Sequence, residues 1–311
     1  MKNRRFIIGS RSSKLAMAQT QYVRDVLKKN YPALDFDIKA IKTKADAIVD
    51  VALSKIGDKG LFTKELEDAL LAREIDLAAH SMKDLPTELT RGLKIAAVTK
   101  REDPRDALVS RQGFTIKTLP KDSGVGTSSL RRRAQLLYLR KDLKIMDLRG
   151  NLDTRINKLD RGLYDAIILA YAGVIRLGLK VNLSAISTED VLPQAGQGAL
   201  GIEVREDNRE VIDMTGALDD ADCHLSIDAE RALLSALEGG CQVPIGVYAE
   251  VNGDRISMKA GVFSLDGKSA VRDEISGNKK DAGALGRQLA EKILKIKGAR
   301  QILEDVRKGM G

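Results

Sequence analysis

The sequence predicts an α/β fold, because short apolar runs alternate with amphipathic helical segments through the first two hundred residues. With 311 residues the chain is long enough for two or three domains that each have a core. From about Asp219 the order changes to one helix, several alternating strands and a helical end. Such segregation is typical of a small α+β domain. We therefore expect two α/β domains followed by a small C-terminal α+β domain.

The first α/β domain is expected to hold four strands and two helices. The predicted strands are Arg5–Gly9, Phe36–Ile41, Leu77–Ala79 and Lys94–Val98, the helices are Ser13–Lys29 and Thr63–Glu74, and Ala45–Gly60 is expected to be a loop. A charged, proline-containing run, Arg101–Asp106, then interrupts the apolar pattern and suits a domain boundary.

A second α/β unit comes after this boundary. Its predicted strands are Ala107–Ser110, Gly124–Thr127, Lys144–Leu148 and Ala166–Ala170, with helices that start near Ser128, Asp153 and Ala172. Gly162 and Gly178 stand where glycines commonly end helices. An isolated strand at Ala199–Val204 needs a sheet to join, so we expect the chain to return there to the first domain.

The last part of the chain is predicted to contain a helix at Ser226–Leu237, strands at Gly246–Val251, Arg255–Phe263 and Ala270–Ile275, and helical structure from Asp281. The expected domains are residues 1–99 with 197–217, residues 104–193, and residues 220–311.

Composition excludes several classes of protein. No apolar run approaches the roughly 20 residues that span a bilayer, and Met1–Ile8 lacks the apolar core of a signal peptide, so a cytoplasmic location is expected. Two cysteines and two histidines are too few for a disulfide framework or a structural zinc site, and no metal is expected. The net charge of +8 instead indicates an anionic partner.

Nucleotide and nucleic-acid partners fit this charge poorly. No dinucleotide or P-loop glycine fingerprint is present. Aromatic residues make up only 4% of the chain, there is no tryptophan, and the arginines are dispersed at turns. Single-strand binding relies on stacking aromatics, so nucleic-acid binding is disfavoured.

Cys241 lies between glycines and a proline in Glu238–Gly246, a pattern that favours a loop presenting a thiol. The alternative is a buried cysteine acting as a small apolar residue, which is the common state of a lone cysteine. Cys223 has no comparable setting and is expected to be buried. A nucleophile pair of Cys223 with His224 stays open as an alternative but is disfavoured, because adjacent helical residues point about 100° apart.

The segment His80–Pro86 directly follows a predicted strand, where ligands commonly bind in open α/β sheets. Asp84 is a candidate acid or base there, with Lys83 and His80 close enough to alter its pKa. Equally, His80 is a candidate for a hydrogen-bonded core histidine and Lys83–Asp84 for a solvated pair. The sequence alone leaves both interpretations open.

A third candidate site leads from a strand into a helix at Gly126–Arg133. Three arginines in the first helical turn oppose the helix dipole, and a bound anion would offset that cost. The alternative is a solvated basic helix face. The turn Gly9–Lys14 has a similar pattern of serines and cations. Later strand ends and helices add further cations that could bind carboxylates: Arg149, Arg155, Lys158 and Arg176.

Taken together, these segments resemble the porphobilinogen deaminase (hydroxymethylbilane synthase) family along nearly the whole chain. The resemblance rests on five motifs in the family's order and spacing: His80–Asp84, Arg101–Asp106, Gly126–Arg132, Leu148–Asn151 and Glu238–Pro244. The sequence departs from some relatives at Lys44 and Lys14, where they have arginine and proline respectively.

The resemblance implies that the first two domains are similar to type II periplasmic binding proteins and that the third carries the cofactor cysteine. It implies one dipyrromethane cofactor, made from the substrate and held by a thioether to Cys241. Four porphobilinogen molecules would be deaminated and added in turn, giving hydroxymethylbilane and ammonia for tetrapyrrole and haem synthesis. A monomer is expected, with no membrane or nucleic-acid partner.

The resemblance also implies site residues. Asp84 matches the catalytic aspartate. Cofactor binding is implied for Cys241, Ser13, Lys83, Asp84, Thr127, Ser129, Arg131, Arg132, Asn151 and Arg155. Substrate binding is implied for Arg11, Ser13, Lys55, Phe62, Arg149, Arg155 and Arg176. A non-enzymatic protein that binds small anions on the same two-lobed fold is the alternative, but it needs neither the thiol nor Asp84.

Overall fold

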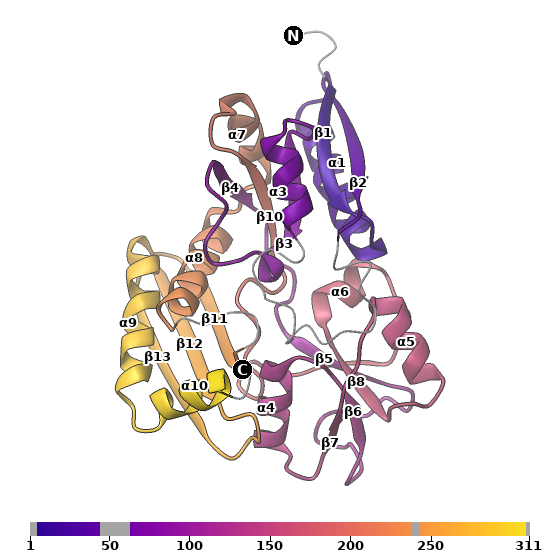
Figure 1. The fold of residues 1–311 in the computed structure, drawn as a ribbon, viewed down its shortest axis with the longest axis vertical. Helices are drawn as coiled ribbons and strands as arrows, with labels where there is room; N and C mark the ends of the chain where they lie inside the picture. Colours follow the sequence, from indigo (N-terminus) through magenta and orange to yellow (C-terminus); the bar gives the residue numbers. More distant parts are fainter. Residues whose placement is uncertain (1–4, 44–62, 238–242, 309–311) are drawn as a thin grey trace. The chain divides into compact units, whose positions relative to one another are not determined.

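The computed structural model describes residues 5–43, 63–237 and 243–308 (Figure 1). The chain divides into two compact units, and each is described by itself. The first unit consists of Met1–Val49, Lys59–Glu102 and Gly198–His224. Among the described residues, the second consists of Asp103–Gln197 and the described part of Leu225–Gly311.

The first unit contains a five-stranded sheet in the order β2-β1-β3-β10-β4. β1 is parallel to β2 and β3, whereas β10 is antiparallel to both β3 and β4. The late strand thus returns to the first sheet, as the sequence predicted, and every predicted boundary in this sheet is within two residues. The strands are β1 (Arg5–Arg11), β2 (Asp35–Ile41), β3 (Leu77–Ser81), β4 (Leu93–Val98) and β10 (Leu200–Arg205).

Helices cover both faces of this sheet. On one face, Val23 and Leu27 of α1 (Lys14–Asn30) pack with residues of α7 (Arg209–Thr215) and the 3-10 helix η3 (Gly216–Leu218) in one core. On the other, Leu66 and Leu70 of α3 (Lys64–Leu71) form a second core. In both helices the apolar pair has i,i+4 spacing, which places it on one side.

The turn that leads into β10 depends on a glycine. Gly198 has a φ of +95°, which side-chain-bearing residues rarely adopt. A Cβ atom there would lie 2.3 Å from the carbonyl oxygen of Glu102. Glycine therefore allows the two connecting segments of the first unit to approach each other closely.

The second unit contains another five-stranded sheet, in the order β7-β6-β8-β5-β9. β6 is parallel to β7 and β8, and β5 is antiparallel to β8 and β9. The two five-stranded sheets thus share one order of parallel and antiparallel neighbours. The strands are β5 (Asp106–Ser110), β6 (Gly124–Gly126), β7 (Lys144–Met146), β8 (Ala166–Ala170) and β9 (Leu183–Ala185).

Both faces of the second sheet are also covered. Leu136 of α4 (Leu130–Leu139) packs on one face, in a core with residues of β5, β6 and β8. α5 (Leu152–Asp160) and α6 (Tyr171–Arg176) pack on the other, through Leu159 and Val174.

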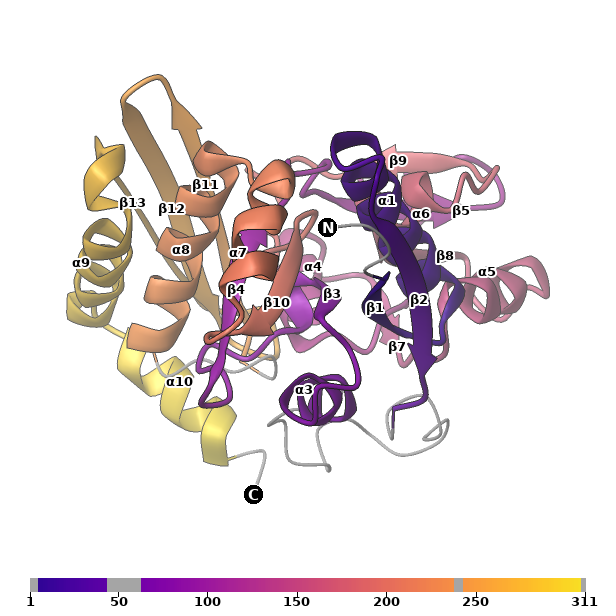
Figure 2. The ribbon, with the colours of Figure 1, turned by 90° about the horizontal axis from the view of Figure 1, so that it is seen from above.

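The C-terminal part of the second unit has a three-stranded antiparallel sheet, β11 (Ile245–Asn252), β12 (Arg255–Phe263) and β13 (Ala270–Asn278). Its core is shared with α8 (Ala221–Ala236), α9 (Ala282–Lys295) and α10 (Ala299–Lys308), and the 3-10 helix η4 (Lys279–Asp281) precedes α9. Figure 2 shows α9 and α10 beside this sheet.

The predicted fold class is confirmed: two five-stranded sheets with helices on both faces have the α/β arrangement, and the smaller C-terminal sheet with its helices has the α+β arrangement. One strand was missed, because β9 has only three residues and no apolar run. The predicted loop at 45–60 lies outside the described residues. The three domains and their boundaries stay a prediction.

Candidate functional site

The first sheet gathers four of the predicted site residues at one edge. β1 and β3 are parallel neighbours, so their carboxyl ends meet at the same edge. Arg11 ends β1, and Ser13 caps α1 by accepting a hydrogen bond from a backbone N–H. Lys83 and Asp84 lie in the 3-10 helix η2 (Met82–Asp84), directly after β3, and both side chains are half-buried.

A buried amide fastens α1 to this edge. Gln19 of α1 donates a hydrogen bond from Nε2 to the hydroxyl of Ser81, at 3.0 Å. Its Oε1 also lies 3.2 Å from the same hydroxyl. Because Ser81 precedes η2, this contact fixes the start of the segment that carries Asp84.

His80 is a core residue. Its side chain is buried, and its Nε2 lies 2.9 Å from Oε2 of Glu203 on the neighbouring strand β10. The burial expected of a core histidine is therefore confirmed for His80, but in the described chain its Nε2 contacts the carboxylate of Glu203 without the expected hydrogen bond.

The second sheet brings a second group of predicted residues to one edge. Thr127 follows β6 and is buried, with its Oγ1 accepting from the N–H of Ser129 at 3.3 Å. Ser129 caps α4 by accepting from the N–H of Arg132 at 3.4 Å. Such caps are the ordinary way to satisfy free N–H groups at a helix start.

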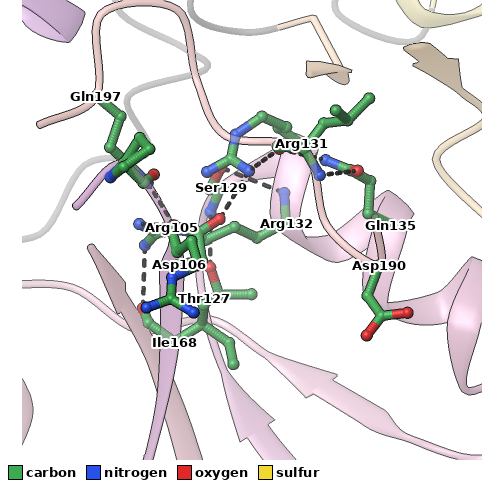
Figure 3. Close-up of polar contacts among 12 residues, drawn as sticks. Arg105, Asp106, Thr127, Ser129, Arg131, Arg132, Gln135, Ile168, Asp190 and Gln197 are labelled. Atoms are coloured by element: carbon green, nitrogen blue, oxygen red, sulfur yellow. Dashed lines mark hydrogen bonds and ion pairs between the residues drawn. The ribbon is translucent and has the colours of Figure 1, made fainter. Parts of the chain in front are cut away.

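Arg131 and Arg132, in the first turn of α4, point at one buried carboxylate (Figure 3). Asp106 opens β5, which is antiparallel to β8, so it lies at the edge where β6 and β8 end. Nη1 of Arg131 lies 2.7 Å from its Oδ2. Arg132 donates to its Oδ1 from Nε at 3.1 Å and from Nη2 at 2.8 Å. Gln197 donates to the same oxygen at 3.0 Å.

These contacts keep Asp106 ionised. Complete burial acts to raise the pKa of Asp106, but the charges of Arg131 and Arg132, with hydrogen bonds from Arg131 and Gln197, outweigh it. The pKa is therefore held well below its usual range. A buried carboxylate between two guanidinium groups thus supplies an internal counter-charge for the arginines that sequence alone assigned to a bound anion.

The two arginines differ in how their donors are used. Each of the three nitrogens of Arg132 meets an acceptor, since Nη1 donates to the carbonyl of Ile168 at 3.0 Å. Arg131 uses Nη1 alone, toward Asp106 and toward the carbonyl of Leu192 at 2.6 Å. In the part of the chain that the structure describes, its buried Nε and Nη2 have no hydrogen-bond partner.

The remaining cations of the second unit are spread over later elements. Arg149 follows β7, and its carbonyl accepts from Nζ of Lys158 at 3.2 Å. Asn151 occupies the N-cap of α5 without a side-chain cap. Arg155 donates from Nε to the carbonyl of Gly150 at 2.7 Å. Arg176 is the last residue of α6.

Three predicted site residues, Lys55, Phe62 and Cys241, lie outside the described residues. Cys223 is buried, as expected.

Sequence reasoning missed Asp106 and Gln197 as members of the second group. The available signal was a carboxylate placed directly before the apolar run Ala107–Val109 of a predicted strand, because a charge in such a place needs partners.

Polar and cationic side chains thus follow the parallel strands of two α/β sheets. Residues 6–213 match the family model described as porphobilinogen deaminase, dipyromethane cofactor binding domain, and residues 224–295 match that of the porphobilinogen deaminase C-terminal domain. The chain belongs to the porphobilinogen deaminase family.

Curated relatives agree over nearly the full length. Porphobilinogen deaminase of Pelotomaculum thermopropionicum is 51% identical over 305 residues, 98% of this chain and 97% of that protein. Porphobilinogen deaminase of Desulforudis audaxviator is 50% identical over 307 residues, 98% of this chain and 99% of that protein.

Among solved structures, the chain is similar to the methionine binding protein MetQ, with a TM-score of 0.45 and 15% identity. This match covers 71% of this chain and 92% of that one.

Among the described residues, no helix has both the length and the apolarity of a membrane span.

Proposed function

We propose that this chain is a hydroxymethylbilane synthase. It deaminates four porphobilinogen molecules in turn, joins them head to tail onto a dipyrromethane cofactor bound to Cys241 by a thioether, and releases hydroxymethylbilane and ammonia. The observation that carries the proposal is the match of residues 6–213 to the cofactor-binding domain of the family. Asp84 and its neighbours at the end of β3 support it.

The residues present fit a group that bears carboxylates. In the described chain, Arg131 keeps two buried guanidinium nitrogens without an acceptor, and a carboxylate accepts two such N–H groups side by side. We assign to the same purpose Ser13, Lys83, Thr127, Ser129, Arg132, Asn151 and Arg155. When bound, the dipyrromethane supplies the pyrrole carbon to which the first substrate unit is joined.

Asp84 is assigned the proton and charge chemistry. Loss of ammonia from an aminomethylpyrrole leaves an electron-poor centre, and a nearby carboxylate stabilises the positive charge that develops. The same carboxylate can hold and return the pyrrole N–H proton. The half-buried position of Asp84 limits the water that would otherwise weaken both effects.

The residues assigned to the substrate are mostly cations, and two of them are also assigned to the cofactor. Each pyrrole of porphobilinogen carries an acetate and a propionate, so every added unit brings two negative charges. Guanidinium groups bind such groups in a bidentate way. The proposed substrate-binding residues are Arg11, Ser13, Lys55, Phe62, Arg149, Arg155 and Arg176.

The test is turnover of porphobilinogen by Asp84→Ala. We expect this variant to keep the circular dichroism spectrum and unfolding midpoint of the parent and to lose turnover by at least about 100-fold, the usual scale for a general acid–base group. Asp25→Ala is the matched control, because Asp25 is an exposed aspartate of the same unit whose partner is Arg24. Turnover near the parent rate in Asp84→Ala would rule out the assigned role.

The cytoplasmic location and the monomeric state stay predictions from the sequence. Cell fractionation tests the first, and light scattering coupled to size-exclusion chromatography tests the second.

A further inference from the structure

Asp106 is a buried carboxylate with three side-chain partners, although one arginine would be enough to balance its charge. It faces two arginines, and Gln197 donates both to it and to the carbonyl of Pro104, the latter at 2.7 Å. The carboxylate is therefore fixed from the segment before β5 as well as from α4. A carboxylate held in this way can dictate where an arginine places the rest of its guanidinium group.

Arg131 is the arginine so placed. Its Nη1 lies between Oδ2 of Asp106 and the carbonyl of Leu192. The position of Leu192 is set independently, because Gln135 donates to its carbonyl at 2.9 Å and accepts from its N–H at 2.8 Å. Nη1 of Arg131 thus forms an ion pair with Asp106 and donates a hydrogen bond to the carbonyl of Leu192. Because both acceptors are held in place, the planar guanidinium can rotate little and its Nε–Nη2 edge keeps one direction.

Nε and Nη2 of Arg131 are buried, and no acceptor within the described chain forms a hydrogen bond with either of them. Burying N–H donors without acceptors costs free energy, so a buried edge that lacks an acceptor within the described chain is suited to an acceptor from outside the chain. Arg132 differs, because its nitrogens already meet Asp106 and the carbonyl of Ile168 (Figure 3).

We propose that Asp106 is a positioning residue that acts through Arg131. It grips Nη1 so that the Nε–Nη2 edge faces a carboxylate of the bound pyrrole chain. Asp106 itself touches neither cofactor nor substrate. This inference rests on the proposed function, because it takes the pyrrole carboxylate as the external acceptor.

The test uses Asp106→Asn and Asp106→Glu in the full chain. Asparagine keeps the size but removes the charge. Glutamate keeps the charge but moves the carboxylate by one methylene. With rates expressed per chain that carries the adduct, we expect the KM for porphobilinogen to rise by about tenfold or more in Asp106→Asn, the effect of one charge-assisted hydrogen bond, with a much smaller change in kcat. Asp106→Glu should fall between the parent and Asp106→Asn.

Two readouts do not depend on turnover. Intact-protein mass should show a smaller fraction of chains carrying the adduct, in the same order of variants. Crystal structures should show the Nε–Nη2 edge of Arg131 turned from its parent direction. Asp142→Asn is the matched control, because Asp142 also pairs with an arginine, Arg140, through two bonds in the same unit but outside the site. It should match the parent in KM and adduct fraction.

The outcomes separate the inference from the proposed function. A parent protein that neither carries an adduct nor turns over porphobilinogen overturns both. A working parent together with a folded Asp106→Asn whose KM is within about twofold of the parent overturns only the positioning role, leaving Asp106 a purely structural counter-charge. If Asp106→Asn does not fold, Asp106→Glu alone decides on the same criterion.

Discussion

His80 and Glu203 form a buried pair across neighbouring strands of the first sheet, with Nε2 and Oε2 2.9 Å apart. The side chain of Glu203 is fully buried, and that of His80 is only 3% exposed. His80 lies in β3, and Ser81 and η2, which contains Asp84, come directly after it. The pair therefore anchors the strand that positions Asp84.

Removing one partner should therefore destabilise the first unit strongly. We expect Glu203→Leu to lower the free energy of unfolding by about 1–3 kcal/mol, because the buried imidazole loses the polar group beside its Nε2. The double change His80→Leu with Glu203→Leu should recover part of that loss, since no polar group then lacks its partner. Urea unfolding followed by circular dichroism measures both. A double variant less stable than Glu203→Leu would contradict this view of the pair.

The contact between α9 and α8 requires a glycine. A Cβ atom on Gly286 would lie 2.2 Å from the carbonyl oxygen of Ala229, which is backbone and cannot move aside cheaply. We expect Gly286→Ala to cost about 1–3 kcal/mol, the usual range for overpacking.

Gly283 on the same helix is the control, because only the end of the Arg287 side chain comes within 4 Å, at 3.7 Å. Gly283→Ala should stabilise the protein by about 0.5–1 kcal/mol through helix propensity. Thermal unfolding of the two variants should thus shift in opposite directions, and equal shifts would count against the close helix contact.

The hairpin between β12 and β13 should contribute to acid sensitivity. A hydrogen bond from Ser264, together with one from the N–H of Lys268, lowers the pKa of Asp266 from 3.8 to about 2. A folded-state pKa below the unfolded value gives stability that is present above about pH 4 and is lost as the pH falls toward 2.

Asp266→Asn should therefore reduce the loss of stability between pH 4 and pH 2. Ser264→Ala should bring the pKa of Asp266 back toward its usual value and give a similar, smaller effect. Urea midpoints measured across this pH range test both changes. An acid limb identical to that of the parent in Asp266→Asn would show that the turn carboxylate does not contribute.

Local pattern was enough to predict most elements, because the strands are short apolar runs and α1 and α3 carry apolar residues at helical spacing. It also predicted the polar groups at the ends of β1, β3 and β6, since chain order fixes which residues come after each strand. Local pattern could not predict the pairing of Asp106 with Arg131. That contact joins residues 25 positions apart and depends on β5 running antiparallel to β8, which no local pattern encodes. The three-residue strand β9 is formed in the same way, by its pairing with β5.

The most direct test of the proposed function is the intact mass of the purified full chain, with the modified peptide mapped. The proposed function predicts an adduct with the mass of two joined pyrrole units, located on Cys241 and absent from Cys241→Ser. Unmodified protein after incubation with porphobilinogen, or a normal covalent adduct in Cys241→Ser, would contradict it.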